Sequence, residues 1–344
     1  MTAAAALWLA ALASDARPPV EDERRGLTIV WVDVDGGAAT LVVSPAGESL
    51  LVDAGWPGGR DARRIAEAAR AEGVTRIDHF VLTHFHTDHW GGVAELAELL
   101  PIERFYDRGL PAQDDPKADR RIRPELRAAW LEATKGKAVE LSPGDLLPLA
   151  GVRVEVLVGD GRTAGEPEGA PQSRACTARP PHEARPDDDS ENALSLGLLL
   201  TLGDFQFLDL GDLTWNVEHK LVCPEDRIGP VDVFQVTHHG HDSSNHPALL
   251  AAARPTVAVI QNGPEKGATE PVLKALRATP GLCDVFQLHR NPDSEDNAPS
   301  ELVANDVEDC RGASIRLELD PSGESYRVEV PSKGTRRTYA VRRD

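Results

Sequence analysis

Four side chains that commonly bind metals lie within six consecutive residues of this sequence, which reads LTHFHTDHWGG from Leu82 to Gly92. They are His84, His86, Asp88 and His89. Imidazole nitrogens and carboxylate oxygens suit zinc, with manganese and iron as alternatives. Side chains two positions apart in an extended segment point the same way, so the first two histidines can bind one ion while Asp88 and His89 turn toward a second. The alternative is a polar loop whose side chains cap a helix.

Polar residues also follow three further apolar runs. Asp53 follows residues 49–52, Asp212 follows residues 205–210, and the pair His238 and His239 follows residues 231–236. Ligands gather at the carboxyl ends of strands in α/β proteins, so we expect these residues to meet the histidine cluster. Asp212 could then bridge two ions and His238 could complete the second, an arrangement that activates water. The alternatives are plain turn aspartates and loop histidines that only form hydrogen bonds.

The elements that must position these residues alternate between strands and helices. Apolar β-rich runs predict strands at 27–34, 39–45, 49–55, 76–82, 152–158, 193–212 (two strands around a turn), 231–236, 256–260, 284–289, 313–319 and 325–330. Helical spacing predicts helices at 60–73, 91–100, 124–135, 247–253 and 270–278. This pattern predicts one α/β domain over residues 26–344, with a flexible surface loop at 159–191 where large apolar residues are scarce.

The composition limits the class of protein and its partners. The 344 residues are 41% hydrophobic and 27% charged, which excludes a coiled coil or a wholly disordered chain. The net charge of −19 works against tight binding to long nucleic acid or an anionic membrane, without excluding it. No run after the N-terminal region approaches the roughly 20 apolar residues of a membrane span. The oligomeric state is not predicted.

Residues 1–25 read as a leader and a charged spacer. A short apolar run at 3–13 precedes Ser14 and resembles the core and cleavage site of a signal peptide, although a basic start is missing. We therefore predict a secreted or periplasmic protein, with an alanine-rich extension of a cytoplasmic protein as the alternative. Of the four cysteines, Cys283 and Cys310 are the expected disulfide pair in an exported chain, and buried free thiols are the alternative.

The chain resembles the metallo-β-lactamase superfamily, whose H-x-H-x-D-H signature is met at residues 84–89. More narrowly, it is similar to the hydrolase domain of competence DNA-uptake proteins and their stand-alone relatives. The similarity is carried by DVDGGAATLVVSPAGESLLVDAG (33–55), ENALSL (191–196), FQFLDLGD (205–212), VTHHGHDSS (236–244) and VIQNG (259–263). The resemblance implies a four-layer αββα sandwich, the metallo-β-lactamase fold, with metals at one edge between two sheets.

The resemblance also implies a role for each residue of the cluster. His84 and His86 would bind the first metal, Asp88, His89 and His238 the second, and Asp212 would bridge, while Asp53 would orient ligands through hydrogen bonds. The third histidine of the first site would fall near residue 192. This chain has Asn192 there and Ser195 three residues later, so the first metal would bind weakly or use another ligand, with His182 as a candidate.

These assignments predict a metal-dependent hydrolase with two Zn²⁺ ions, or Mn²⁺ or Fe ions. A metal-bound hydroxide oriented by Asp88 would attack an ester-type bond, with Asp212 as the bridging carboxylate. A phosphodiester in a small molecule or short chain is the favoured substrate. The alternatives are a lactone or β-lactam hydrolase, or a non-catalytic or redox metal-binding member of the same fold.

Several residues are candidates for contacting the substrate. The acid that protonates the leaving group would come from the rim of the site, where the candidates are His239, His241, Lys266 and His289. Ser243 and Ser244 could donate hydrogen bonds to a phosphate oxygen. Each of these residues could equally serve as an ordinary strand-end or loop residue.

Overall fold

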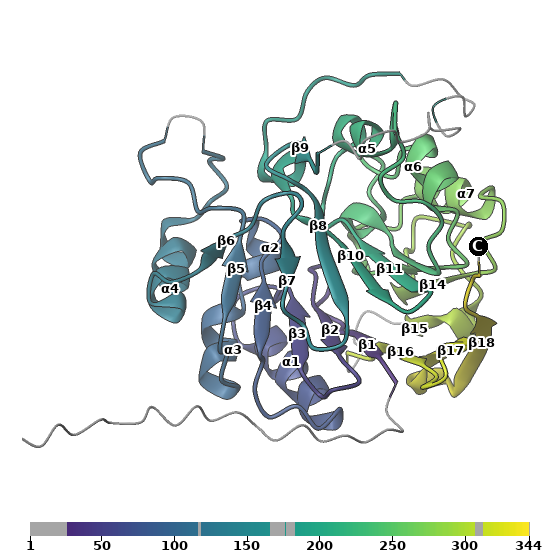
Figure 1. The fold of residues 1–344 in the computed structure, drawn as a ribbon, viewed down its shortest axis with the longest axis horizontal. Coiled ribbons are helices and arrows are strands. Elements are labelled where there is room, and N and C mark those ends of the chain that lie inside the picture. The colour runs from purple at the N-terminus through teal and green to yellow at the C-terminus, as the bar shows by residue number, and fades with distance from the viewer. Residues whose placement is uncertain (1–25, 116–117, 166–175, 177–182, 307–311, 344) are drawn as a thin grey trace, which may run out of the picture.

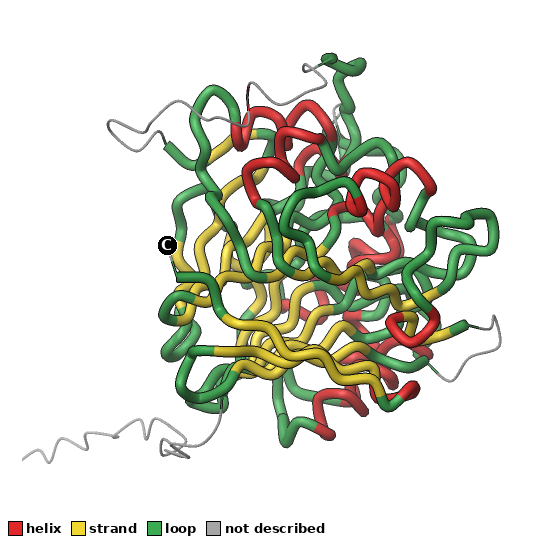
Figure 2. Tube along the Cα trace, turned by 90° about the vertical axis from the view of Figure 1, so that its right-hand side faces the viewer, coloured by secondary structure: helices red, strands yellow, loops and turns green. Residues whose placement is uncertain are grey.

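The computed structural model describes residues 26–115, 118–165, 176, 183–306 and 312–343. Within this part, two mixed β-sheets pack face to face, and helices cover the outer face of each sheet (Figures 1 and 2). The predicted leader at residues 1–25 and the candidate ligand His182 lie outside the described residues. No helix in the described segments is long and apolar enough to cross a membrane.

The first sheet has nine strands in the order β18-β17-β16-β1-β2-β3-β4-β5-β6. Its bounds are β1 (Thr28–Trp31), β2 (Thr40–Val43), β3 (Ser49–Val52), β4 (His79–Val81), β5 (Phe105–Asp107), β6 (Val139–Glu140), β16 (Ile315–Leu319), β17 (Ser325–Val330) and β18 (Thr335–Ala340). Strands β3 to β6 run parallel to one another. The helices that accompany it are α1 (Arg60–Ala71), α2 (Thr87–Trp90), α3 (Val93–Leu99) and α4 (Pro124–Thr134).

The second sheet follows the order β15-β14-β13-β12-β11-β10-β8-β7, and β9 pairs with β8. Its strands are β7 (Leu146–Leu147), β8 (Arg153–Gly159), β9 (Arg162–Thr163), β10 (Gly197–Leu202), β11 (Phe205–Asp209), β12 (Val233–Gln235), β13 (Val257–Ile260), β14 (Asp284–His289) and β15 (Val303–Asn305). Strands β11 to β15 are parallel. Its helices are α5 (Trp215–Val222), α6 (Pro247–Ala253) and α7 (Glu270–Arg277).

Three clusters of buried apolar side chains fill the spaces between the four layers. The central cluster joins the inner faces of the two sheets, for example where Trp31 of β1 meets Phe207 of β11 with ring centroids 5.7 Å apart. A second cluster lies between the second sheet and α5 to α7, and a third lies between the first sheet and α1 to α4. Helix α1 buries the predicted face of Ala62, Ile65, Ala66 and Ala69. The four-layer αββα sandwich is therefore confirmed.

The expected strands and helices are present, and most have shorter bounds, whereas β14, β17 and α6 have the predicted bounds and β8 is shifted by one residue. The structure also adds elements that the periodicity did not predict. The added elements are β5, β6, β7, β9, β15, β18, α2 and α5. Most of these are strands of two or three residues, too short for an apolar alternation to develop. Helix α5 begins at Trp215, where only Val217, Leu221 and Val222 supply its large buried apolar side chains.

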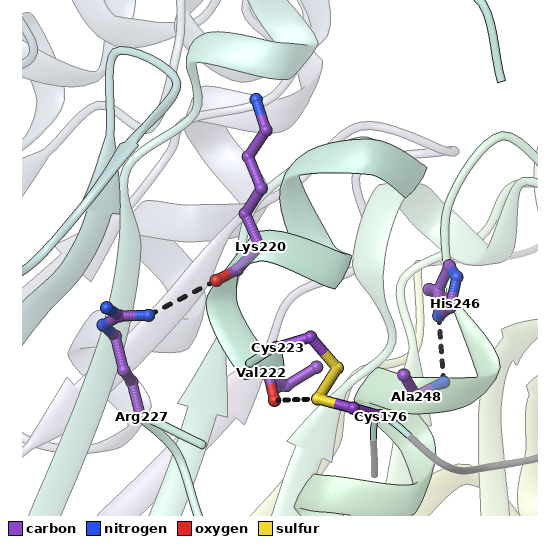
Figure 3. Close-up of a disulfide and its surroundings, with 7 residues drawn as sticks. All are labelled: Cys176, Lys220, Val222, Cys223, Arg227, His246 and Ala248. Atoms are coloured by element: carbon purple, nitrogen blue, oxygen red, sulfur yellow. Dashed lines mark hydrogen bonds between the residues drawn. A yellow bond between two sulfur atoms is a disulfide. The ribbon is translucent and has the colours of Figure 1, made fainter. Parts of the chain in front are cut away.

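The disulfide prediction was wrong. Cys176 pairs with Cys223 at the end of α5 (Figure 3). Cys283 is free and exposed. The Cα atoms of the bonded pair lie 5.5 Å apart, within the range that a disulfide spans. Cys310 lies outside the described residues. The prediction failed because pairing depends on which loop lies over α5, and sequence spacing carries no information on that.

The described end of the predicted loop is attached to the second sheet's helices. Arg185 places its guanidinium 3.7 Å from the centre of the Trp215 ring, and its backbone N–H donates to Asn216 at 3.0 Å. The Trp215 indole donates to the carbonyl of Glu183 at 3.1 Å. Residues 183–191 are thus fixed along α5 and lead directly to Asn192.

Candidate metal centre

The polar strand ends of the two sheets meet at one edge of the sandwich. Asp53 follows β3 and the histidine cluster follows β4, its parallel neighbour in the first sheet. Asp212 follows β11, and His238 follows β12, its parallel neighbour in the second sheet. His84 Nε2 lies 3.9 Å from Asp212 Oδ2, across the boundary between the sheets. The convergence predicted from strand ends is therefore present in the structure.

Four buried residues form what we name the central group: Asp88, His89, Asp212 and His239. One ligand atom from each lies within 4.8 Å of all the others. His89 Nε2 is 3.4 Å from both Asp88 Oδ2 and Asp212 Oδ2, and His239 Nε2 is 3.3 Å from Asp88 and 3.4 Å from Asp212. Among the described residues, neither Nε2 atom has a hydrogen-bond partner. Two imidazoles and two carboxylates with buried, unpartnered nitrogens fit a transition-metal ion.

Hydrogen bonds on the far side of each ring orient the central histidines. His89 Nδ1 lies 2.6 Å from the Asp53 carboxylate, which also accepts from the backbone N–H and hydroxyl of Thr83, each at 2.8 Å. His239 Nδ1 lies 2.9 Å from the carbonyl of Gln261 and donates to it. Because Nδ1 is held in this way, Nε2 of both rings faces the centre of the group.

The charges of the central group depend strongly on one another. Burial lowers the pKa of His89, but the carboxylates of Asp212, Asp88 and Asp53 raise it well above its ordinary value. Burial raises the pKa of Asp212, but His239, His89 and His238 hold it well below its ordinary value. In the absence of metal, protons on the imidazoles thus balance the carboxylates. A metal ion would replace these protons, since histidine binds metals in its neutral form.

Beside the central group lies a second set, the side group, made of His84, His86, His238 and Asn192. His84 Nε2 is 3.0 Å from His86 Nδ1. His238 Nε2 is 3.5 Å from Asp212 Oδ2 and 3.2 Å from the Asn192 amide. Asp212 is therefore next to both groups. Burial lowers the pKa of His238 to about 4, so this ring is neutral at pH 7.

The two consecutive histidines after β12 point in different directions because the backbone adopts a left-handed conformation at both. His238 has φ 56° and ψ 47°, and His239 has φ 53° and ψ 16°. This conformation costs free energy in residues other than glycine and often marks a functional site. It turns His239, the residue predicted only as a rim acid, toward Asp88. The sequence assigned that position to His238, which the structure places in the side group.

Two acidic residues that were not among the predicted site residues support the side group. His86 Nε2 is 3.1 Å from Asp119, which also accepts the backbone N–H of Glu191 at 3.1 Å. Glu191 is 1% exposed, pairs with Arg108, and accepts the backbone N–H of Phe85 at 3.2 Å, between the two histidines. Asp119 lies in no motif, and Glu191 opens the ENALSL segment without being a predicted ligand, so only the folded chain reveals their contacts with the histidine segment.

The serines near the central group form hydrogen bonds with other residues of the chain. Ser195 accepts the backbone N–H of Asp212 at 3.3 Å. Ser243 lies 3.0 Å from His238 Nδ1 and 2.9 Å from His241 Nδ1. Ser244 donates to the Leu213 carbonyl at 2.7 Å and therefore accepts from His238 Nδ1, 3.1 Å away. The serines thus hold His238 with Nε2 toward Asp212.

The remaining rim candidates occupy different environments. His289 is buried, with Nε2 2.7 Å from Asp33 Oδ1, and it does not line the open pocket beside Lys266. Lys266 contacts the Asp88 carboxylate and lines an open pocket of about 510 Å³ together with His241. The other residues that line this pocket are Glu265, Gly267, Thr269, Glu270, Asn291 and Asp293.

The loop between β1 and β2 lies against the segment that carries the histidine cluster. A Cβ on Gly37 would be 2.5 Å from the carbonyl oxygen of Asp88, so only glycine allows this approach. The next residue, Ala38, donates its backbone N–H to the same carbonyl at 3.1 Å. The DGG sequence after the first strand is thus explained by packing.

Comparisons with known proteins identify the family of the chain. The family model of the Metallo-beta-lactamase superfamily matches residues 32–263. The chain is 27% identical over 209 residues to ComE operon protein 3 of Bacillus subtilis (strain 168), covering 60% of this chain and 23% of that protein. It is 37% identical over 81 residues to hydroxyacylglutathione hydrolase of Xanthomonas campestris pv. campestris (strain B100), covering 24% and 29%.

Among solved structures, the chain is similar to the metallo-beta-lactamase fold protein YhfI from Bacillus subtilis. It has 13% sequence identity and a TM-score of 0.43, and the alignment covers 76% of this chain and 95% of that one. The chain spans less than a third of the length of the two curated relatives. The family match covers more than half of the chain and includes both groups of ligand-type residues. The chain belongs to the metallo-beta-lactamase superfamily.

Proposed function

We propose that this protein is a metal-dependent hydrolase that cleaves an ester-type bond in a small molecule, with a phosphodiester as the favoured substrate. The observation that carries the proposal is the central group, where two buried imidazole nitrogens without hydrogen-bond partners face two carboxylates. Lys266, which contacts Asp88 of this group, also lines a pocket of about 510 Å³. Metal-ligand chemistry and room for a small substrate thus occur together.

The proposed ligands divide between two ions. Asp88, His89 and His239 would hold one ion, and Asp212 would be shared with a second. The side-group histidines would hold the second ion, with His238 in place of the missing third histidine, because its neutral Nε2 already lies 3.5 Å from Asp212. Two imidazoles and two carboxylates favour Zn²⁺, with Mn²⁺ or Fe as alternatives.

When bound, two such ions would lower the pKa of a water molecule and offset the negative charge that develops at the bond being cleaved. The chain itself fixes the site before any substrate arrives. Asp53 and Gln261 hold the central rings with Nε2 inward. Asp88 and Asp212 contribute the negative charge, which is retained because their carboxyl pKa values are held well below the ordinary value. This preorganisation is what electrostatic catalysis requires.

The phosphodiester preference rests on the rim of the site. His241 and Lys266 both line the pocket, Lys266 contacts Asp88, and both side chains can donate hydrogen bonds to an anionic group. The net charge of −19 favours small substrates over long nucleic acid. Two relatives of the chain carry the names hydroxyacylglutathione hydrolase and atrochrysone carboxyl ACP thioesterase, so a carboxylic thioester belongs among the substrates to test.

A non-catalytic metal-binding protein is the second candidate. It is favoured by Asn192, which stands in the side group where the superfamily resemblance places a histidine, and whose Oδ1 is buried without a hydrogen-bond partner among the described residues. An amide is a weak ligand for zinc, so the second ion could be absent. The number of metals per chain separates the two candidates.

The test is to strip the protein with a chelator, reload it with Zn²⁺ or Mn²⁺, and count the metal by mass spectrometry. The reloaded protein is then assayed with bis(p-nitrophenyl) phosphate, a lactone, a cephalosporin, a thioester and single-stranded DNA. We expect two ions per chain and the highest kcat/KM with the small phosphodiester. One ion and no turnover of any substrate would support the non-catalytic candidate.

We also propose that the protein works outside the cytoplasm, in the periplasm or after secretion. The disulfide between Cys176 and Cys223 supports this, because such bonds persist in oxidising compartments. Cell fractionation with mass-spectrometric mapping of the disulfide tests it. Detection of the chain only in the cytoplasm, with both thiols reduced, would contradict it.

A further inference from the structure

Lys266 lies between the central group and the open pocket. Its ammonium contacts the carboxylate of Asp88 and lies 5.4 Å from the centre of the Trp56 ring. The side chain is 36% exposed, whereas that of Asp88 is 10% exposed. The ammonium therefore faces a proposed metal ligand on one side and solvent on the other.

The backbone on both sides of Lys266 is fixed to the histidine turn. The carbonyl of Lys266 accepts the N–H of Gly263 at 2.9 Å, and the N–H of Ala268 donates to the carbonyl of His239 at 2.8 Å. A Cβ on Gly267 would lie 2.0 Å from that same carbonyl, so the turn requires glycine. Lys266 thus starts from a rigid base tied to the central group, and only its side chain is free to reorient.

The contact between Lys266 and Asp88 would compete with a metal ion in the central group. The carboxylate of Asp88 lies 3.3 Å from His239 Nε2 and 3.4 Å from His89 Nε2, the two nitrogens without hydrogen-bond partners. A divalent cation held there would share the charge of Asp88 and repel the nearby ammonium. The ammonium would then gain most from an incoming anion, which it can reach through the exposed part of its side chain.

The pocket beside Lys266 suits a small anion but not a long one. Its volume of about 510 Å³ is typical of small-molecule sites. Its lining includes the exposed acidic residues Glu265, Glu270 and Asp293. Glu270 pairs with Lys274, which leaves two exposed acids to repel further phosphates of an extended chain. The lining therefore offers a single ammonium, that of Lys266, to one anionic group and disfavours a polyanion.

We propose that Lys266 is the cation that binds the substrate's phosphate, and that the substrate is a small molecule with a single phosphodiester. This inference rests on the proposed hydrolase function and gives Lys266 a binding role in place of proton donation to the leaving group. A lysine that binds an anion lowers KM for charged substrates. A lysine that only positions Asp88 would instead alter metal content and affect all substrates equally.

The test compares metal-loaded wild type with Lys266→Met, Lys266→Arg and the control Lys137→Met, which changes an exposed lysine after α4. We expect Lys266→Met to keep its metal, to bind inorganic phosphate about tenfold more weakly by calorimetry, and to raise KM for bis(p-nitrophenyl) phosphate but not for neutral p-nitrophenyl acetate. Lys266→Arg should retain most phosphate affinity, and Lys137→Met should match wild type.

Two results of the binding measurement would overturn the inference: unchanged phosphate affinity in a fully metal-loaded Lys266→Met protein, or a loss of metal that accounts for the weaker binding. The calorimetric arm does not need turnover. If wild type hydrolyses none of the esters, the proposed hydrolase function fails, while the phosphate affinities still decide the role of Lys266. Equal KM values for wild type and Lys266→Met on the phosphodiester would also count against it.

Discussion

The central group and the side group sit next to each other but are held in place by different parts of the fold. The outer nitrogens of the central histidines bond to Asp53 and Gln261, which directly follow buried strands and are each 1% exposed. The side group relies on loops: His86 contacts Asp119 in the stretch after β5, and His238 contacts Ser243 and Ser244 after η3 (Thr237–Gly240).

The difference suggests a division of stability across the site. Groups fixed by strand ends share the stability of the whole fold, whereas surface loops open at lower free-energy cost. A metal held by the central group should therefore bind more tightly than one held by the side group. Asp212 lies next to both groups, so it couples metal binding in the central group to metal binding in the side group.

Replacing the shared carboxylate tests that coupling and should have the largest effect. Asp212→Asn keeps the shape, but an amide nitrogen cannot ligate a metal, so both ions lose a ligand and the offset to their mutual repulsion. We expect a folded protein with less metal and activity reduced by at least about 10²-fold. The control Asp204→Asn lies in the exposed β10–β11 turn and should behave as wild type. Two ions and full turnover in Asp212→Asn would show that Asp212 is only a turn residue.

Removing one histidine from each group separates the two halves. We expect His239→Ala to lose the tightly held ion and to bind metal at least about tenfold more weakly overall. His238→Ala should retain one ion of near-normal affinity and lose only the weaker one. Metal counts after dialysis against graded chelator measure this, with the exposed His241→Ala as a comparison for metal content. Equal losses of metal from the two variants would show that the central group and the side group bind metal equally tightly.

Loss of a supporting carboxylate should weaken only the side group. Asp119→Asn leaves His86 with a poorer partner for its outer nitrogen, and such changes typically lower metal affinity by about 10- to 100-fold. We expect the lower end of that range, and no change in the ion of the central group. Asp114→Asn, an exposed residue of the same loop, is the matched control. Weakening of both ions together would mean that the loop supports the whole site.

In both groups, the sequence located the residues that directly follow strands but not the histidine whose direction depends on a turn, and the reason is physical. Asp53, the histidine cluster and Asp212 follow apolar strands, so a local pattern locates them at a common sheet edge. The strand periodicity also located most of both sheets. The choice between His238 and His239 was beyond the pattern, because it depends on two left-handed residues in a turn.

The support of the side group could not be predicted for a related reason. Asp119 and Glu191 come from separate loops and bear on the histidines only after the chain has folded. The same applies to the disulfide, since Cys176 and Cys223 are 47 residues apart and meet only where a loop reaches the end of α5. Contacts between loops leave no periodic trace in sequence, whereas contacts within sheets do.

Glu218 allows a finer test of how the second sheet supports the side group. This buried residue of α5 accepts the backbone N–H groups of Asn245 at 3.0 Å and His246 at 2.8 Å, just after the serines that hold His238. Burial raises the pKa of Glu218 from 4.5 to about 7, more than these hydrogen bonds lower it. Glu218 thus supports the side group indirectly from inside the fold, because it holds the backbone that follows the serines in contact with His238.

The raised pKa has a definite sign for stability. Below pH 4.5 Glu218 is protonated in both the folded and the unfolded chain; between pH 4.5 and 7 only the unfolded chain releases the proton, so stability falls as pH rises. The loss is at most about 3 kcal/mol, since each pH unit is worth about 1.4 kcal/mol. Glu218→Gln removes this proton exchange, so we expect the Tm of the metal-free variant to fall less from pH 4.5 to 8 than that of wild type, by about 5 °C.

Other groups titrate alike in both proteins, and the exposed Glu132→Gln controls for the change of side chain. The same pH dependence in Glu218→Gln and wild type would show that Glu218 is ionised in the folded protein, and that its loop is held less firmly than its burial indicates.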